Sequence, residues 1–290
     1  MIADLIFVLK DFAWRILPRK LINILNTFYF NSRKNKKQKF LLLHVFAASK
    51  CNLNCKSCST FAPVASDSLL DICEYENDCK RLSFLGHDKI PEIHILGGEP
   101  LLHPNIVEIL RISRKYFPLA KLKIVTNGIL LKKQTDEFWN TCKNCSVEII
   151  ISHYPIKIDI EKIMKISNEY GVSIRYYKGK LPWFKIPLDL QGKNDINKNY
   201  KKCQAALQCV SLFNGKISTC QLIYNIRFFR EYFNKEINSV EGDYIDIYKA
   251  DSMDEILEFI GKPVPFCRFC TLEWLPVEWR ISKKEMKEWV

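Results

Sequence analysis

The segment that decides the fold is FLLLHVFAASKCNLNCKSC, residues 40–58. Its first eight residues are almost all apolar and predict a buried β-strand. Cys51, Cys55 and Cys58 follow directly, and no fourth cysteine lies close to them in the sequence. Because a structural zinc site usually has four protein ligands, three cysteines after a buried strand indicate a metal site of another kind.

Beyond this segment, short apolar stretches alternate with amphipathic ones as far as Lys178. The apolar stretches predict four more strands, at 92–98, 121–128, 147–154 and 172–178. The stretches between them predict helices at 70–85, 105–117, 135–142 and 159–171. This alternation is typical of βαβ units and a parallel sheet, in which functional groups gather at the carboxyl ends of the strands. We therefore expect an α/β fold.

Three polar segments stand at these predicted strand ends. Gly97-Gly98-Glu99-Pro100 follows the second strand, Thr126-Asn127-Gly128 ends the third, and Ser152 ends the fourth. Two adjacent glycines allow the backbone to approach a ligand that side chains would keep away. Each segment alone is a weak signal, but the three in this order after the cysteines form a specific pattern.

The Cys-x3-Cys-x2-Cys spacing and these segments together resemble the radical S-adenosylmethionine (SAM) superfamily, over residues 40–178. The resemblance implies a partial (β/α)6 TIM-like barrel, with a sixth strand between Phe184 and Leu190 or just before the second cysteine group. It implies that a 4Fe–4S cluster is held by Cys51, Cys55 and Cys58, with one iron open to SAM. It implies SAM contacts from Gly97, Gly98, Glu99, Pro100, Thr126, Asn127 and Ser152. Ser57 replaces an aromatic residue common in the superfamily, so we expect Phe61 to pack near adenine.

A second group of cysteines follows a predicted connecting loop. In SLFNGKIST, the pair Asn214-Gly215 between two β-prone stretches predicts a hairpin with a left-handed turn, and Cys220 is expected on its return strand. The group resembles the twitch domain, a shortened SPASM domain. This resemblance implies an auxiliary 4Fe–4S cluster held by Cys203, Cys220, Cys267 and Cys270, with Cys209 in reserve. The expected domains are a leader (1–39), the radical SAM core (40–200) and the auxiliary-cluster domain with the tail (201–290).

Zinc is the alternative for both groups of cysteines. At the first group zinc would need a fourth ligand, and neither His44 nor His87 lies at a usual finger spacing. At the second group, four cysteines could form a structural zinc site that joins two chain segments. The remaining cysteines are interpreted as packing residues, although one near the barrel mouth could serve as a hydrogen-atom donor. They are Cys73, Cys79, Cys142, Cys145 and the reserve candidate Cys209.

The leader differs in composition from the rest of the chain. The net charge is +12, but nine basic and two acidic residues lie in the first 40, which leaves +5 on the other 250. This asymmetry argues against a nucleic-acid surface over the whole fold. Apolar residues from Ile2 to Phe28, interrupted by Pro18, recur at helical spacing. Two interpretations stay open: a helix on an anionic membrane face, or a helix packed on the main domain.

The expected location is the cytoplasm, with a peripheral contact at the inner membrane face as an option. Twelve cysteines in a chain of 290 residues without a cleavable signal favour metal ligands over disulfides. No segment approaches the ~18 to 20 apolar residues of a spanning helix.

The resemblance implies an enzyme in which a 5'-deoxyadenosyl radical removes hydrogen from a small-molecule substrate. We expect oxidation or epimerisation of a sugar or cyclitol carbinol, because an auxiliary cluster could accept the electron that oxidation releases. A flavodoxin or ferredoxin is the expected reductant. Polar and aromatic side chains placed at the barrel mouth for a carbohydrate are His153, Tyr154, Tyr176, Tyr177, Lys178 and Trp183.

Two other functions stay open. One is a peptide-modifying radical SAM maturase, for which the 40-residue leader is too short to hold a recognition domain of winged-helix type. The other, of a different class, is a non-catalytic iron–sulfur or zinc protein on the same scaffold. No catalytic base is assigned from the sequence.

Overall fold

The computed structural model describes residues 38–176, 183–185, 187–203, 205–272 and 275–290. Almost all of the predicted leader (1–39), and Tyr177 and Lys178 of the expected barrel mouth, lie outside the described residues. No helix in the described part of the chain is both long and apolar enough to span a membrane.

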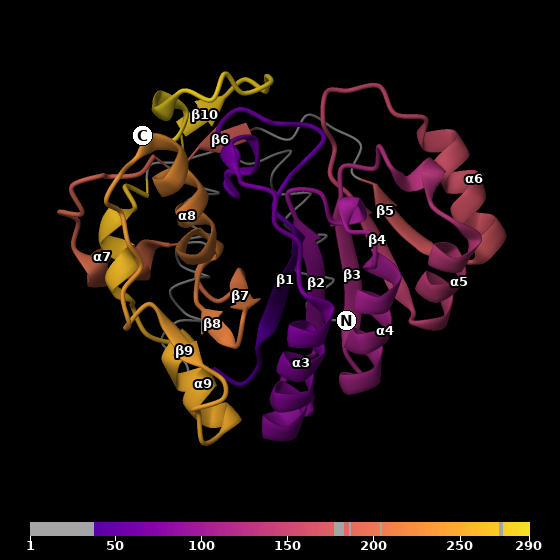
Figure 1. Ribbon diagram of the computed structural model, residues 1–290, viewed down its shortest axis with the longest axis horizontal. Coiled ribbons are helices and arrows are strands. Elements are labelled where there is room, and N and C mark those ends of the chain that lie inside the picture. The colour runs from indigo at the N-terminus through magenta and orange to yellow at the C-terminus, as the bar shows by residue number, and fades with distance from the viewer. Residues whose placement is uncertain (1–37, 177–182, 186, 204, 273–274) are drawn as a thin grey trace, which may run out of the picture.

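An eight-stranded sheet, in the order β5-β4-β3-β2-β1-β7-β8-β9, runs through the molecule (Figure 1). The five strands predicted from the sequence are confirmed, and neighbouring ones pair in parallel. They are β1 (Leu42–Ala48), β2 (Glu92–Gly97), β3 (Lys121–Thr126), β4 (Val147–Ile151) and β5 (Ser173–Tyr176). Strands β2, β3 and β4 end where the Gly97, Asn127 and Ser152 loops begin, so these loops share one edge of the sheet.

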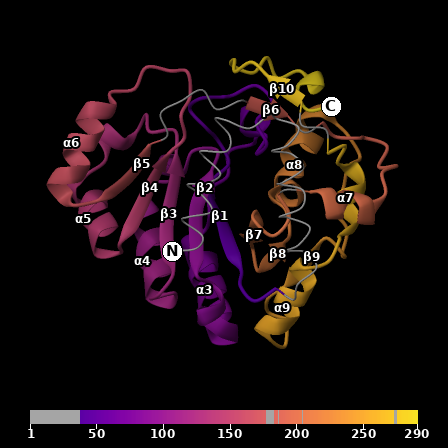
Figure 2. The same cartoon turned by 180° about the vertical axis from the view of Figure 1, so that it is seen from behind.

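Four helices lie along one face of this parallel part, as the two opposite views show (Figure 1; Figure 2). They are α3 (Ile72–Gly86), α4 (Ile106–Tyr116), α5 (Asp136–Asn144) and α6 (Ile160–Tyr170), close to the predicted ranges. Asp71, Thr135 and Asp159 begin three of them by accepting a backbone N–H. Gly171 ends α6 with a φ of 68°, a left-handed conformation in which glycine carries no side-chain penalty.

The core forms between these helices and every second residue of the strands. Because strand side chains alternate between faces, one set is buried against the helices and the other lies on the opposite face. Fully buried members of the first set are Leu43, Val45, Ile93, Ile95, Ile124 and Ile149. The intervening residues of the same strands include charged side chains, among them Glu92, Lys123 and Glu148.

The sixth parallel strand lies at neither position expected from the sequence. Strand β7 (Val210–Phe213) begins within the second cysteine group and pairs in parallel with β1, at the edge away from β5. The 184–190 stretch instead overlaps β6 (Trp183–Lys185), which pairs with β10 (Leu275–Val277) in a separate two-stranded sheet. The prediction failed because the free edge of β1 is filled by an apolar segment from more than 160 residues later in the chain.

The C-terminal part extends the same sheet. Strands β8 (Lys216–Ser218) and β9 (Tyr244–Asp246) continue it in antiparallel fashion. The predicted hairpin is confirmed, with Asn214 and Gly215 at φ values of 45° and 70° between β7 and β8. Helices α8 (Gln221–Phe233) and α9 (Met253–Ile260) follow β8 and β9. The predicted connecting loop contains one further helix, α7 (Ile196–Lys202), capped by Asp195.

Candidate functional site

The first three cysteines lie in the loop that follows β1, where Cys55 is buried and Cys51 and Cys58 are half-buried. Burial raises the pKa of the Cys51 thiol to about 11 and that of Cys55 to about 12. Isolated thiols here would therefore stay protonated near neutral pH. A bound cation would be needed to hold them as thiolates, the form that binds metal.

Each of the three sulfur atoms has a hydrogen-bonding neighbour. The Leu53 N–H lies 3.4 Å from the Cys51 sulfur, and the Trp279 indole N–H lies 3.2 Å from the Cys55 sulfur. The Cys58 sulfur lies 3.2 Å from the Thr60 hydroxyl. Metal-bound thiolates accept such hydrogen bonds from the surrounding protein. The donor set therefore fits cluster ligation by the three cysteines.

Within the described residues, no three or more His, Cys, Asp or Glu side chains converge on a single metal-ion position. In a cubane cluster each cysteine binds a different iron atom, so its cysteines stand further apart than the ligands of one ion. This finding leaves the cluster assignment as a prediction.

The predicted SAM loops form a network that supports the cysteine loop. The Glu99 carboxylate, 1% exposed, accepts hydrogen bonds from the Thr126 hydroxyl at 2.6 Å and the Asn127 N–H at 2.9 Å. Burial raises the pKa of Glu99. The Asn127 side-chain amide in turn donates to the Asn52 side chain at 2.7 Å and lies 3.7 Å from the Cys51 sulfur. The Glu99 side chain is thus engaged inside the protein, and the atoms this loop can offer a ligand are backbone atoms.

The two glycines of this segment pack against the backbone that leads into the cysteines. A Cβ atom at Gly97 would lie 2.3 Å from the Ala48 carbonyl oxygen, and one at Gly98 would lie 2.3 Å from that of Lys50. The Gly98 and Glu99 N–H groups donate to these same carbonyls. The structure shows close approach of these glycines to the chain itself, and their close approach to a ligand stays a prediction.

Ser152 and Tyr154 approach the same site from the end of β4. The Ser152 N–H donates to the Thr126 carbonyl at 2.9 Å. The Tyr154 side chain is half-buried, and this burial, together with the nearby Cys55 thiol, raises its pKa. Its ring also contacts Trp279 edge to face, with ring centres 6.5 Å apart.

The prediction that Phe61 packs near adenine is wrong, because its side chain is already enclosed. It is 1% exposed, and its ring centre lies 5.7 Å from Phe229 and 5.9 Å from Trp289. The rings of Tyr154 and Trp279 instead meet beside the Cys55 sulfur. Among the other expected mouth residues, the His153 and Tyr176 rings lie 5.7 Å apart.

The second cysteine group lines one cavity. Its wall includes all four predicted ligands, Cys203, Cys220, Cys267 and Cys270, together with mostly apolar side chains. Cys209 is not part of this wall, and burial raises its pKa to about 12. The Asn199 side-chain amide of α7 donates to the carbonyls of Cys267 and Cys270, which holds the distant Cys-x2-Cys beside Cys203.

Cys220 lies past the return strand on which it was expected. It is the N-cap residue of α8, where its sulfur accepts the Leu222 N–H. The next residue, Gln221, donates its side-chain N–H to the Ser59 hydroxyl at 3.2 Å. Ser59 directly follows Cys58, so this contact joins the two groups of cysteines in space.

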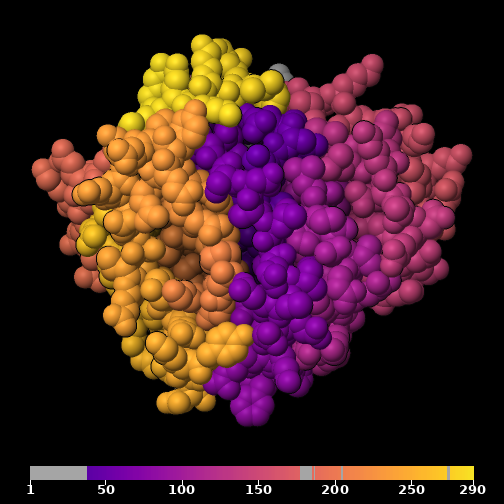
Figure 3. All heavy atoms as spheres, viewed as in Figure 1, coloured from indigo at the N-terminus to yellow at the C-terminus, as the bar shows by residue number. Residues whose placement is uncertain are grey.

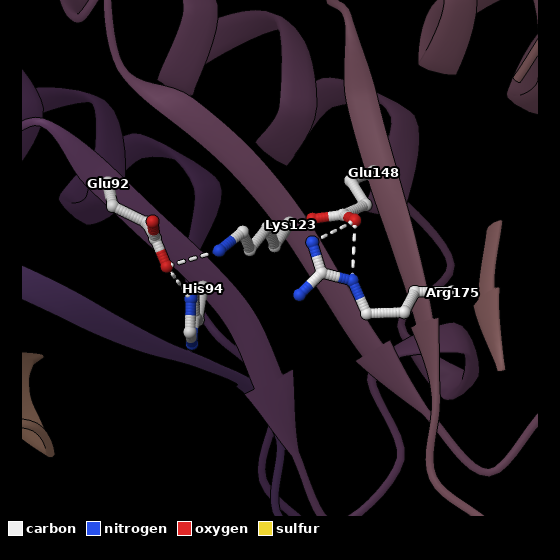
Figure 4. A network of polar contacts seen from close by, with 5 residues as sticks. All are labelled: Glu92, His94, Lys123, Glu148 and Arg175. Atoms are coloured by element: carbon white, nitrogen blue, oxygen red, sulfur yellow. Dashed lines mark hydrogen bonds and ion pairs between the residues drawn. The ribbon is translucent and has the colours of Figure 1, made fainter. Parts of the chain in front are cut away.

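Sequence analysis missed a row of charged residues on the sheet face opposite α3–α6. Glu92 accepts hydrogen bonds from His94 and Lys123, and Arg175 pairs with Glu148 (Figure 4). Burial opposes ionisation of Glu92, but these hydrogen bonds lower its pKa to about 2. The available signal was the alternation of polar and apolar residues in β2, β3 and β4, which indicates that these strands are not apolar on both faces.

His44 continues this row on β1. It pairs in register with His94, and the two rings stack with centres 5.1 Å apart. Burial lowers the pKa of His44 to about 3, and its buried Nδ1 makes no hydrogen bond to any described residue. His44 is therefore a neutral imidazole on the sheet face opposite α3–α6.

Comparison with known proteins finds similarity over the part of the chain that carries the first cysteine group. The Radical SAM superfamily model matches residues 46–170. GTP 3',8-cyclase of Chlorobaculum tepidum is 34% identical over 94 residues, which are 32% of this chain and 28% of that protein. GTP 3',8-cyclase of Helicobacter pylori is 27% identical over 128 residues, 44% of this chain and 38% of that protein. The chain thus spans less than two fifths of the length of these two relatives.

A solved structure extends the likeness to the fold as a whole. BtrN in complex with AdoMet and 2-DOIA aligns with a TM-score of 0.51 and 18% identity, covering 81% of this chain and 94% of that chain. At this identity the match shows a shared fold, which includes the C-terminal region beyond the family match. Over residues 46–170, the sequence of the chain matches the Radical SAM superfamily.

Proposed function

We propose that the protein is a radical SAM enzyme that oxidises or epimerises a carbinol of a small polyhydroxylated molecule such as a sugar or cyclitol. Cys51, Cys55 and Cys58 would hold the SAM-binding cluster, and Cys203, Cys220, Cys267 and Cys270 an auxiliary cluster. With SAM bound, these groups would supply a 5'-deoxyadenosyl radical for hydrogen abstraction and an acceptor for one electron.

One observation carries the choice of oxidation. The Gln221–Ser59 hydrogen bond joins the residues that directly follow Cys220 and Cys58, so the auxiliary site adjoins the SAM site. Loss of hydrogen from a carbinol carbon leaves an electron and a proton to be removed before a ketone forms. An electron acceptor next to the site of hydrogen abstraction meets that requirement, whereas epimerisation needs a hydrogen donor instead.

The protein's own side chains support a polar substrate. His153 and Tyr176, at the carboxyl ends of β4 and β5, provide polar and aromatic groups at the edge of the sheet that carries the first cysteines. The fold shared with BtrN, whose bound molecule is named 2-DOIA, is consistent with a small-molecule substrate. A flavodoxin or ferredoxin would deliver the electron for SAM cleavage.

The test is SAM cleavage by anaerobically reconstituted, dithionite-reduced protein. We expect 5'-deoxyadenosine from wild type and from Cys73→Ser, which changes an exposed cysteine away from both groups, and none from Cys55→Ala. A panel of cyclitols and amino sugars should then contain a compound that yields a ketone in proportion to the 5'-deoxyadenosine formed. Absence of 5'-deoxyadenosine in wild type would favour the non-catalytic iron–sulfur or zinc protein.

A further inference from the structure

The C-terminal segment lies directly across the first cysteine loop. The Lys56 N–H donates to the Arg280 carbonyl, and the Ser282 N–H donates to the Asn54 carbonyl, each at 2.8 Å. Cys55 and Ile281 therefore pair like residues of two antiparallel strands. Figure 3 shows the yellow C-terminal atoms against the indigo atoms of the N-terminal part of the core. The cysteine loop is thus held on one side by a segment more than 220 residues away in sequence.

Two tryptophans of this segment donate hydrogen bonds to the loop, but to different atoms. The Trp279 indole N–H lies 3.2 Å from the Cys55 sulfur. The Trp289 indole N–H donates to the Cys58 carbonyl oxygen at 2.8 Å. An indole has one donor and no acceptor, so its direction is unambiguous. Only Trp279 therefore reaches an atom that would bind iron.

The position of Trp279 is fixed on several sides. Its ring contacts Tyr154 edge to face. Glu288, which is 2% exposed, holds the segment that follows Trp279 in place. Its carboxylate accepts hydrogen bonds from the Ser282 hydroxyl at 2.6 Å and the Lys283 N–H at 2.7 Å. A donor held from both sides loses little conformational freedom when it bonds to a charged sulfur.

We propose that Trp279 is a positioning residue that raises the reduction potential of the cluster held by Cys51, Cys55 and Cys58. This inference rests on the function proposed above. Reduction adds negative charge to a cluster and its thiolates. A hydrogen bond to a ligand sulfur stabilises that charge, so it favours the reduced state. The C-terminal segment would then tune the first electron transfer of the reaction as well as cover its site.

The experiment is a redox titration of reconstituted full-length protein, in which electron paramagnetic resonance follows the signal that changes when SAM is added. This signal reports the cluster with an open iron and not the auxiliary one. Trp279→Phe keeps an aromatic ring against Tyr154 but removes the donor. We expect its ratio of reduced to oxidised cluster to fall about tenfold at a fixed potential, which corresponds to about 59 mV for a one-electron couple.

Trp289→Phe is the matched control, because it removes an indole donor from the same segment without changing a bond to sulfur. We expect its ratio to stay within about twofold of wild type, since the partner it loses is a neutral carbonyl. A normal SAM-responsive signal with an unchanged potential in Trp279→Phe, or an equal shift in both variants, would overturn this inference alone. A wild type without that signal would contradict the proposed function and this inference together.

Discussion

The two groups of cysteines differ in how the chain builds them. The first comes from eight consecutive residues of one loop, and polar segments at the ends of β2, β3 and β4 adjoin it. The second brings together Cys203, Cys220, Cys267 and Cys270 from three separate stretches around a mostly apolar cavity. A site with polar surroundings and three cysteines suits a cluster whose fourth iron must bind a small molecule. A closed four-cysteine site suits electron transfer or structural support.

The largest expected effect tests whether the first group alone governs SAM chemistry. Replacing Cys51, Cys55 and Cys58 together by alanine should lower the iron content from about eight to about four atoms per chain, because one of two cubanes is lost. It should also abolish 5'-deoxyadenosine formation. Iron and acid-labile sulfide analysis after anaerobic reconstitution measures the first, and chromatography the second. If the wild type holds only about four irons and the variant loses all of them, the second group of cysteines holds no iron–sulfur cluster.

The second prediction separates the cavity ligands from Cys209. Cys220→Ala should lose about four irons while keeping SAM cleavage, because its sulfur lines the second cavity and not the first loop. Cys209→Ala is the matched control and should keep all the iron, since Cys209 is not part of the cavity wall. If Cys209→Ala loses iron and Cys220→Ala keeps it, then Cys209 is the cluster ligand and Cys220 is not.

A third, smaller effect concerns the charged row on the sheet that carries the first site. The folded-state pKa of Glu92, about 2, lies below its ordinary value of 4.5, so its stabilisation is present above pH 4.5 and is lost as the pH falls toward 2. Glu92→Gln should therefore lower the free energy of unfolding by about 2 kcal/mol at pH 7. The difference from wild type should narrow below pH 4.5.

Anaerobic denaturant titrations at several pH values measure this difference. Glu108→Gln serves as a control, because its carboxylate is exposed on α4 and its ion pair with Arg111 contributes little. A constant difference between wild type and Glu92→Gln down to pH 3 would show that Glu92 stabilises the sheet by packing and not by its charge.

The smallest expected effect tests how the second site is held. The Asn199 amide donates to two carbonyls of the Cys-x2-Cys turn, and Asn199→Ala should cost about 1 to 2 kcal/mol of stability because each carbonyl loses a hydrogen bond. It should also speed loss of the auxiliary iron to a chelator without affecting the SAM-responsive signal. Equal acceleration at both clusters would mean that the two sites unfold as one unit.

Local signals in the sequence were sufficient for much of the fold. Alternating apolar periods predicted β1 to β5 and the helices between them, and the Asn214-Gly215 pair predicted the hairpin. The spacing of Cys51, Cys55 and Cys58 led to the superfamily that the family match supports. These features depend on residues close together in the chain, so their physical causes are visible without the tertiary structure.

Features that depend on distant residues could not be predicted in the same way. The pairing of β7 with β1 was missed because a short apolar strand does not encode which free edge it fills. The enclosed position of Phe61 was missed because Phe229 and Trp289 cover it from far along the chain. The charged row of Glu92, His94 and Lys123 was missed because Lys123 reaches Glu92 only across the neighbouring strands β2 and β3.

By itself, the sequence determined the βαβ order, the hairpin turn and which cysteines stand together at the end of β1, since each follows from local periodicity, turn chemistry or spacing. The tertiary structure decided which atoms surround those cysteines. The Trp279–Cys55 contact joins residues 224 positions apart, and Gln221–Ser59 joins residues 162 apart. Such contacts form only when packing of the whole sheet brings the C-terminal region back over β1, and no short-range pattern specifies that outcome.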